Sequence, residues 1–298
     1  MDRGVYPVLQ MPLDEGENID PVVLAKEINW LIDLGAAGFV LAMVSEVLRF
    51  TSDERRTQWQ LTLKLIDGRA PLVVSIGTES TVVAVKQAQL AELDGASLLM
   101  ATPPAIFPAT SEEIYSYYRA IAQAVQIPLI VQDASNYMGQ PLPIELYERL
   151  LGEFGTTKIQ FKPEAVPVKD RVTAIQRVTQ GQSRVFEGQS GMDLLDTHPL
   201  GLVGTMPGSE IVWAIKALWD ALEVQDLPRA TDIHAAISRL IAFQPSLDAY
   251  VAVEKYLLVK QGIFSTTKQR GPVGIVLSAE MKLSIDKVFE ELVEIVAK

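Results

Sequence analysis

The sequence predicts an α/β protein built as a closed (β/α)8 barrel with a C-terminal helical appendage. Short apolar segments alternate with longer amphipathic segments over about the first 208 of the 298 residues. Strict alternation of this kind requires parallel strands joined by helical crossovers, and eight units of about 25 residues match a closed barrel. From about residue 209 onward the strand patterns stop, and four helical patterns follow.

Eight segments have the length and the β-branched or apolar composition of buried strands. Two of the helical segments between them open with Thr-Ser-Asp-Glu (51–54) and Thr-Ser-Glu-Glu (110–113), which is the pattern of a capping box. The predicted strands are 5–10, 38–42, 71–77, 97–102, 128–133, 158–162, 184–188 and 201–206.

An open, doubly wound sheet is the alternative fold. It is disfavoured because the first predicted strand is followed by Glu-Gly-Glu-Asn (15–18) and not by a glycine-rich phosphate loop. We therefore expect residues 1–222 to form the barrel. Residues 223–298 would form helices that pack on it within a single structural unit.

The composition excludes several classes of function. A net charge of -11 and a pI near 4.8 disfavour binding to nucleic acid or to anionic membranes, which would require clustered Lys and Arg. The chain has no cysteine, and its two histidines, His198 and His234, lack the spacing of a zinc site, so we expect no metal. No signal peptide or membrane-spanning segment is evident, which predicts a soluble cytoplasmic protein.

The segment Lys-Ile-Gln-Phe-Lys (158–162) carries the main candidate for chemistry. With Ile159 and Phe161 packed outward against helices, Lys158, Gln160 and Lys162 would face the barrel interior. Lys162 stands at the carboxyl end of the strand, where barrel enzymes place their active sites. Among packed side chains the charged form of a lysine is costly, and the neutral amine can attack a carbonyl carbon. A structural lysine in a salt bridge is the alternative.

The same segment, Phe-Lys-Pro-Glu-Ala (161–165), resembles the Schiff-base lysine segment of the dihydrodipicolinate synthase and N-acetylneuraminate lyase superfamily. The resemblance extends over nearly the whole chain. It implies a (β/α)8 barrel, a homotetramer or homodimer, and an imine between Lys162 and the C2 carbonyl of pyruvate or another 2-keto acid. The further matching segments are 38–55, 77–81, 101–104, 187–188 and 201–208.

Departures from the pattern of many members argue against dihydrodipicolinate synthase activity itself. Gln132 stands where those members carry a tyrosine that relays protons, and a carboxamide cannot ionise near neutral pH. Tyr137 falls near the position of the substrate-binding arginine. Met43 and Val44 replace the paired threonines that hold the pyruvate carboxylate.

The segments Ala-Met-Val-Ser-Glu (42–46) and Val-Gln-Asp-Ala (131–134) resemble instead the branch that contains L-2-keto-3-deoxyarabonate dehydratase. The resemblance implies that Ser45 binds the substrate and that Glu46 and Asp133, together with Gln132, are candidate catalytic groups. For both carboxylates a structural role stays open. Thr102, Glu187 and Thr205 end three other strands and are candidate substrate-binding residues beside Tyr137.

The expected activity is the dehydration of a 2-keto-3-deoxy sugar acid through a lysine imine, with no cofactor. The protonated imine nitrogen makes a C3 proton acidic, and an acid near C4 assists the departure of the hydroxyl as water. An aldolase or dihydrodipicolinate synthase that uses pyruvate is the second possibility. A non-catalytic protein that binds a 2-keto acid is the third.

Overall fold

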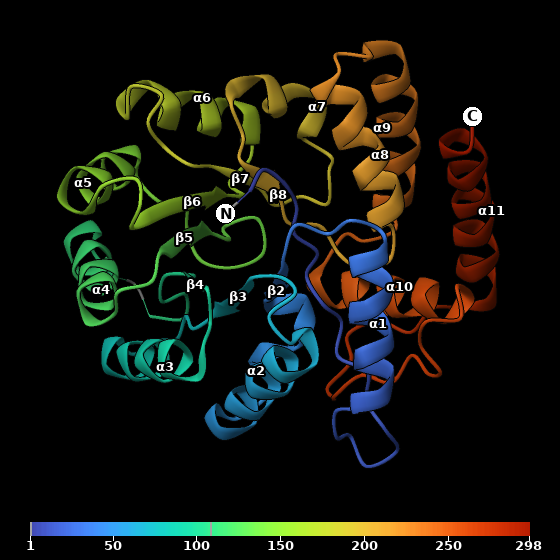
Figure 1. Cartoon of the computed structure of the whole chain (residues 1–298), viewed down its shortest axis with the longest axis horizontal. Coiled ribbons are helices and arrows are strands. Elements are labelled where there is room, and N and C mark those ends of the chain that lie inside the picture. Colours follow the sequence, from blue (N-terminus) through green and yellow to red (C-terminus); the bar gives the residue numbers. More distant parts are fainter. Residues whose placement is uncertain (1, 108) are drawn as a thin grey trace.

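Eight short parallel strands form the centre of the molecule (Figure 1). The computed structural model describes residues 2–107 and 109–298. All eight predicted strands are confirmed. They are β1 (Gly4–Val5), β2 (Phe39–Leu41), β3 (Leu72–Ser75), β4 (Leu98–Ala101), β5 (Leu129–Asp133), β6 (Ile159–Pro163), β7 (Phe186–Glu187) and β8 (Gly204–Thr205). Six are shorter than their sequence patterns, β6 is shifted by one residue, and β1 overlaps its predicted range only at Val5.

The strands close into a barrel. One run of neighbours is β2-β3-β4-β5-β6 and the other is β1-β8-β7, all of them parallel. Single bridges between Val8 and Val40 and between Phe161 and Val185 join the two runs. Past Val5 the amides of Tyr6 and Val8 still donate to the carbonyls of Thr205 and Pro207, whereas Pro7 between them has no amide to donate toward β2. Its carbonyl still accepts from the Val40 amide at 2.9 Å.

Helices surround the strands in Figure 1, and the helices beyond β8 lie on one side of the ring. Both predicted capping boxes are present, because the Thr51 and Thr110 hydroxyls accept from the amides of Glu54 and Glu113. The helices are α1 (Pro21–Asp33), α2 (Ser52–Ile66), α3 (Thr81–Asp94), α4 (Ser111–Ala124), α5 (Ile144–Phe154), α6 (Val168–Val178), α7 (Leu194–Thr197), α8 (Val212–Glu223), α9 (Leu227–Ile241), α10 (Leu247–Lys260) and α11 (Ala279–Val296), with 3-10 turns η1 (Met43–Ser45), η2 (Val47–Arg49) and η3 (His198–Leu200).

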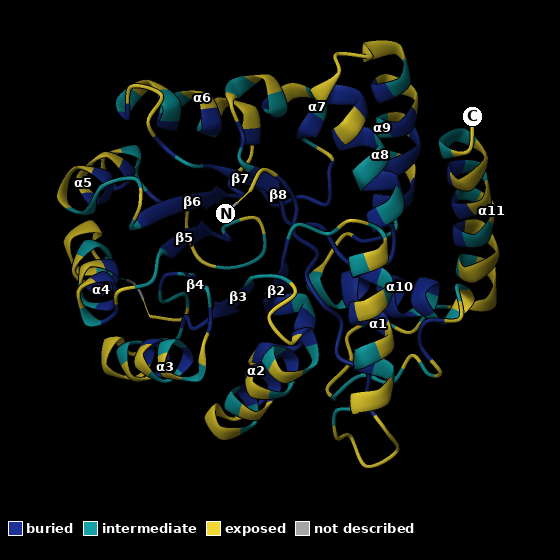
Figure 2. Cartoon of the chain, in the orientation of Figure 1, coloured by how far each residue is buried: buried dark blue, intermediate teal, exposed yellow. Residues whose placement is uncertain are grey.

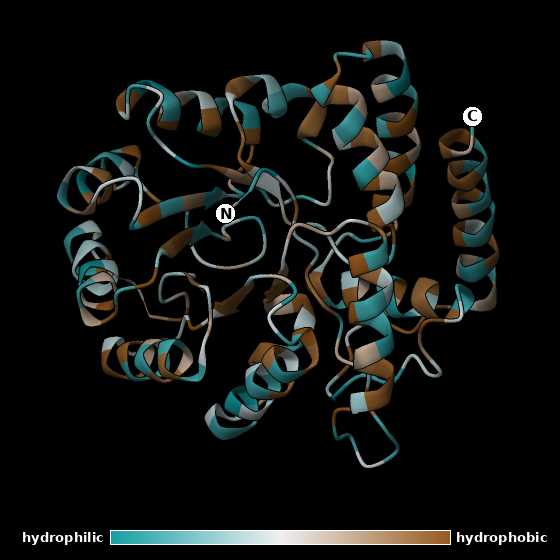
Figure 3. Ribbon diagram, in the orientation of Figure 1, coloured by the Kyte–Doolittle hydropathy of each residue, from teal (hydrophilic) through white to brown (hydrophobic). Residues whose placement is uncertain are grey.

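The alternation of side chains along the strands produces two apolar cores. Ile159 and Phe161 of β6 pack outward into the large core between the strands and the helices, as their phase predicts. The helices present buried faces to this core and exposed faces to solvent (Figure 2), and apolar residues follow the same pattern (Figure 3). A separate cluster fills the barrel interior, and it consists of Tyr6, Val8, Val40, Ala42, Val73, Leu98, Met100, Ile130, Phe186 and Met206.

The four predicted C-terminal helices are confirmed as α8 to α11. Helix α11 packs against α8 and α9 through contacts such as Trp213 with Phe289, whose rings are 5.8 Å apart. Helix α10 instead reaches the carboxyl ends of the strands, where Tyr250 packs edge-on against Tyr137 with ring centroids 5.9 Å apart. A (β/α)8 barrel with C-terminal helices is therefore the fold of the protein. A boundary at residues 222 and 223 stays a prediction.

No helix among the described residues is long and apolar enough to cross a bilayer.

Candidate active site

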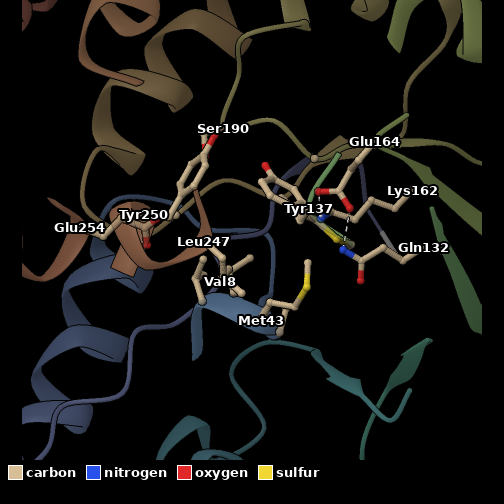
Figure 4. A pocket seen from close by; sticks show the side chains of 15 residues that line it. Val8, Met43, Gln132, Tyr137, Lys162, Glu164, Ser190, Leu247, Tyr250 and Glu254 are labelled. Atoms are coloured by element: carbon tan, nitrogen blue, oxygen red, sulfur yellow. Dashed lines mark hydrogen bonds and ion pairs between the residues drawn. The ribbon is translucent and has the colours of Figure 1, made fainter. Parts of the chain in front are cut away.

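Three side chains from two neighbouring strands meet at the carboxyl end of the barrel. The Lys162 Nζ donates to Glu164 Oε1 at 2.9 Å, and the Gln132 Nε2 donates to Glu164 Oε2 at 2.6 Å. Figure 4 shows the three side chains turned toward one another. All three are at most 4% exposed. The buried lysine and the buried carboxylate thus compensate one another's charge.

The local structure explains why these residues meet. Lys162 and Gln132 are direct partners in the β5–β6 register, so their side chains leave the ladder on the same face. Glu164 follows Lys162 by two residues and therefore shares its phase. Gly188, just after β7, leaves space for the lysine: a Cβ there would lie 2.6 Å from the Lys162 Cε and 2.9 Å from the Glu164 Cδ.

A cavity opens beside the Lys162 ammonium group, and its walls come from both ends of the chain. Met43 and Val44 of η1 lie in one wall, while Leu247, Tyr250 and Glu254 of α10 form another. Of the described residues that line it, Lys162 is the single cation. The complete lining is Val8, Ala42, Met43, Val44, Gln132, Tyr137, Lys162, Glu164, Gly188, Ser190, Met206, Gly208, Leu247, Tyr250 and Glu254.

Burial changes the acidity of the groups around the lysine. It raises the pKa of the Glu164 carboxyl, while the Lys162 charge and the Gln132 amide act in the opposite direction. Burial, followed by the nearby Glu164 charge, raises the pKa of the Tyr137 phenol. Tyr137 is therefore a neutral phenol near pH 7, and its hydroxyl donates to the Gln189 Oε1 at 3.1 Å.

Three predicted site residues thus line the cavity together, namely Lys162, Gln132 and Tyr137. The other six predicted site residues lie outside the cavity lining: Ser45, Glu46, Thr102, Asp133, Glu187 and Thr205.

Asp133 stands next to Gln132 on β5 and so has the opposite phase. Its carboxylate accepts hydrogen bonds from the Leu142 amide at 3.0 Å, the Tyr147 hydroxyl at 3.2 Å and the Arg171 guanidinium at 3.0 Å. These partners lie in and before α5 and in α6. The carboxylate therefore faces the helices, outside the cavity lining.

Glu46 is also held by partners away from the cavity. Its Oε1 accepts from the Lys255 Nζ at 2.5 Å and its Oε2 accepts from the Arg270 amide at 2.8 Å. The neighbouring Ser45 hydroxyl donates to the Leu9 carbonyl at 2.6 Å and accepts from the Ala42 amide at 3.1 Å. Both side chains therefore hold the turn after β2 against other parts of the chain.

The ends of β7 and β8 are tied together by Glu187. Its carboxylate accepts from the Thr205 hydroxyl and from the amides of Gln189, at 2.6 Å, and Gly191. Burial raises the pKa of Glu187 to about 7. These bonds fix the loop that carries Gly188 and Ser190 into the cavity wall.

Thr102 lies outside the cavity lining and packs against Gly77. A Cβ on Gly77 would lie 2.8 Å from the Thr102 Oγ1, so a glycine is required for this close approach.

The other candidate lysine lies at the opposite end of its strand. The Lys158 Nζ donates to the carbonyls of Val125, at 2.5 Å, and Ile127, at 2.8 Å, and the side chain is partly exposed. This position is the amino end of β6, so Lys158 is remote from Lys162 although its strand phase is the same.

Neither histidine lines the cavity. His198 contacts Glu223 at 2.8 Å, and His234 contacts the Met192 carbonyl at 2.7 Å. Within residues 2–107 and 109–298, no three or more His, Asp or Glu side chains are arranged to hold a metal ion.

Several cavity residues were not predicted from the sequence. Glu164 could have been predicted, because a carboxylate two positions after a strand-end lysine lies on the same face of the strand as the lysine. Ser190 lies in the loop after β7, where strand phase no longer indicates direction. Tyr250 and Glu254 lie on α10, and no local pattern indicates that this helix approaches β6.

Comparison with known proteins identifies the relatives of this chain. Residues 1–292 match the model of the dihydrodipicolinate synthetase family. The chain is 26% identical to L-2-keto-3-deoxyarabonate dehydratase of Azospirillum brasilense, over 91% of this chain and 88% of that protein. It is 24% identical to 4-hydroxy-tetrahydrodipicolinate synthase of Chloroherpeton thalassium, over 98% and 96% of the two chains.

Among solved structures, dihydrodipicolinate synthase from Thermotoga maritima superposes with a TM-score of 0.89 at 20% identity, covering 98% of this chain and 99% of that one. This likeness supports the barrel fold. The match of the family model over almost the whole chain shows the family itself: the protein is a member of the dihydrodipicolinate synthetase family.

Proposed function

We propose that the protein is a Schiff-base lyase that dehydrates a 2-keto-3-deoxy sugar acid. The observation that carries the proposal is the position of the Lys162 amine, which is buried, lines a cavity and lies 2.9 Å from a single carboxylate, Glu164. An amine in this position can attack the C2 carbonyl of a 2-keto acid once it has lost a proton.

Glu164 is suited to take that proton. Its pKa is raised by burial, so the carboxylate is a stronger base than an exposed one. The amine adds to C2, water leaves, and a protonated imine forms that withdraws electrons from C3. Gln132 holds Glu164 through its amide and keeps the carboxylate beside the reacting carbons.

One carboxylate can then complete the dehydration. Glu164 removes a proton from C3 to give an enamine, and the resulting carboxylic acid protonates the C4 hydroxyl. The C4–O bond breaks as the enamine electrons form a C3–C4 double bond and restore the iminium. Hydrolysis of the imine frees Lys162. The similarity to a 2-keto-3-deoxyarabonate dehydratase supports this substrate class.

Cleavage of the C3–C4 bond is the second candidate, as in an aldolase or in a dihydrodipicolinate synthase that uses pyruvate. The observation that favours it is Tyr137, a phenol that lines the same cavity and could replace the tyrosine missing at Gln132. We prefer dehydration because burial and Glu164 keep the Tyr137 phenol neutral, whereas cleavage requires a base for the C4 hydroxyl. A protein that binds a 2-keto acid without turnover is the third candidate.

The remaining candidate residues receive positioning roles. Asp133 ties β5 to α5 and α6, and Glu46 and Ser45 hold the turn after β2. Glu187 and Thr205 fix the loop after β7.

We also expect a small homo-oligomer, a dimer or tetramer, in the cytoplasm. Ile106 and Phe107 after β4 are 74% and 69% exposed, and contact between subunits would cover them. Sedimentation analysis measures the mass directly, and a monomer at micromolar concentration would contradict the expectation.

Product analysis tests the reaction class. With a 2-keto-3-deoxypentonate, dehydration, isomerisation and hydrolysis give 2-oxoglutarate semialdehyde, while C3–C4 cleavage releases pyruvate. We expect the semialdehyde as the main product. A lactate dehydrogenase assay for pyruvate and a semicarbazide assay for the aldehyde, run on one sample, separate the two. Dominant pyruvate would replace the dehydratase assignment with an aldolase, and trapped imine without either product would indicate a binding protein.

A further inference from the structure

The end of the cavity opposite Lys162 contains a buried carboxyl group with an unpaired oxygen. Figure 4 shows Tyr250 and Glu254 on the side of the cavity away from Lys162. The Glu254 side chain is 1% exposed, and only its Oε2 has a hydrogen-bond donor, the Gln10 amide. Its Oε1 has no hydrogen-bond partner among the described residues. A buried acceptor left unpaired is costly unless a ligand supplies its partner.

A second buried carboxyl lies beside it. Glu210 follows β8, and its Oε2 also has no hydrogen-bond partner among residues 2–107 and 109–298. A Cβ on Gly208 would stand 2.5 Å from the Glu210 Oε2 and 2.5 Å from the Glu254 Oε1, so the two oxygens are no further apart than twice that distance. Gly208 itself lines the cavity. Both unpaired oxygens therefore gather where the missing side chain leaves space.

No Lys or Arg side chain among the described residues forms an ion pair with either carboxyl group. Lys162, the single cation of the described lining, is already bonded to Glu164. The nearest lysine in sequence, Lys255, donates to Glu46 and to the Lys268 carbonyl. Burial raises the pKa of Glu210 to about 7, and burial together with Glu210 raises the pKa of Glu254 well above its usual range. Two close carboxyl groups without a cation share protons rather than ionise together.

We propose that Glu254 binds a hydroxyl group at the far end of the substrate, and that the Glu210–Glu254 pair excludes 2-keto acids whose far end is a carboxylate. A hydroxyl can accept a hydrogen bond from a protonated carboxyl and donate one to the unpaired oxygen of the other. A ligand carboxylate would instead have to share the same protons with two buried carboxyl groups, at a place where no described lining residue supplies a further cation. The substrate class is thereby narrowed to 2-keto acids with a neutral, hydroxylated tail.

The expected selectivity arises from the cost of leaving a buried hydrogen-bonding group without a partner. Sites built to hydrogen-bond a hydroxyl reject analogues that leave their buried groups unpaired, by as much as about 10⁴-fold. We expect a smaller ratio here, about 10-fold to 100-fold, because Glu254 keeps its hydrogen bond from the Gln10 side-chain amide whichever ligand is bound. The imine at Lys162 is the anchor of this ligand, so the inference rests on the proposed function.

A matched pair of unreactive ligands tests the proposal on the full-length protein. 5-Hydroxy-2-oxopentanoate and 2-oxoglutarate have the same carbon chain and differ only in the terminal group. Neither carries a C4 hydroxyl that could leave, so only imine formation is measured, by borohydride trapping and mass spectrometry. Concentrations are counted as open-chain ketone, measured by NMR. The wild type should be half-trapped by the hydroxy acid at a concentration about 10-fold lower than by 2-oxoglutarate.

Variants assign the effect to the carboxyl pair. Glu254→Gln keeps the shape but removes the acid, and it should reduce the ratio between the two ligands by about 10-fold. Glu210→Gln removes the neighbour that keeps Glu254 protonated, so discrimination against 2-oxoglutarate should persist or increase. Glu92→Gln is the control: it alters a partly buried carboxylate that accepts from the amides of Gln126 and Ile127, outside the cavity lining, and the ratio should not change.

The outcomes distinguish a failure of the proposed function from a failure of the tail-binding role of Glu254. Trapping with pyruvate, which has no tail, reports whether each variant is folded and whether Lys162 is competent. If no 2-keto acid is trapped on wild-type Lys162, the proposed function fails and this proposal falls with it. If pyruvate is trapped but 2-oxoglutarate is bound as well as the hydroxy acid, only the tail-binding role of Glu254 is overturned. If Glu254→Gln still traps pyruvate and the ratio between the two ligands is unchanged, the tail-binding role of Glu254 is likewise overturned.

Discussion

Two buried lysines in this molecule each donate to a buried glutamate, but they lie in different parts of the fold. Lys162 on β6 is 4% exposed and donates to Glu164 at 2.9 Å. Lys255 on α10 is fully buried and donates to Glu46 at 2.5 Å. Each therefore forms a buried ion pair, which by itself indicates neither stability nor function.

The difference lies in what else each ammonium group meets. Lys255 also donates to the Lys268 carbonyl at 2.6 Å and does not line the cavity, while its partner Glu46 accepts from the Arg270 amide. Lys162 lines the cavity, with Gly188 leaving room beside it. A buried lysine becomes a candidate nucleophile through open space beside its nitrogen, not through burial or pairing alone.

The largest expected effect comes from Lys162→Ala. Removing the nucleophile eliminates the covalent route, so turnover should fall by at least about 10³-fold. Circular dichroism should be unchanged. In the wild type, borohydride with pyruvate should place the adduct on the peptide that contains Lys162, and Lys158→Ala serves as the control that keeps activity. An adduct on Lys158, or substantial turnover by Lys162→Ala, would reverse the assignment.

The second effect concerns Lys255→Met, which should destabilise the protein without removing its chemistry. The change removes the cation that donates to Glu46 Oε1 and leaves this buried carboxylate with the Arg270 amide and, at 3.6 Å, the Arg49 guanidinium. The free energy of unfolding should therefore fall by about 3 kcal/mol, the lower end of the range for a broken buried ion pair. Denaturant unfolding measures this cost, and borohydride trapping at Lys162 should persist in the folded fraction.

Adding Glu46→Gln to Lys255→Met provides the control for that cost, because it removes the stranded charge. Most of the lost stability should return. If Glu46→Gln alone abolishes turnover in a folded protein, Glu46 takes part in the chemistry and Lys255 is not a purely structural lysine.

The third effect is a pH dependence of stability on the Lys255 side of the molecule. Burial raises the pKa of Glu27 from 4.5 to about 8 in the folded protein. Between those pH values the folded state keeps a proton that the unfolded chain releases, so stability falls as pH rises, by up to about 1.4 kcal/mol per pH unit. The Glu27→Gln variant lacks this contribution.

Unfolding free energies at pH 5, 6, 7 and 8 should therefore fall more steeply for the wild type than for Glu27→Gln. Parallel curves for the two proteins would show that Glu27 is ionised in both states.

The sequence predicts the fold well because the fold depends on local periodicity. Alternating side chains along β6 send Ile159 and Phe161 outward and Lys162 inward, whatever the rest of the chain does. The same rule, applied to β5, separates Gln132 from Asp133, and applied past the end of β6 it would have indicated Glu164. Loop and turn residues such as Ser45 and Glu46 have no such period, and hydrogen-bond partners distant in sequence decide where they point.

The sequence by itself determined the (β/α)8 barrel, its C-terminal helices and the strand-end position of Lys162, because these follow from spacings within a few residues. Tertiary structure decided that α10 closes the cavity and that Glu254 meets Glu210 beside Gly208. It also decided that Lys255 pairs with Glu46, a partner 209 positions away. Such contacts depend on how helices pack around the finished barrel, and burial then sets the protonation of the groups that they bring together.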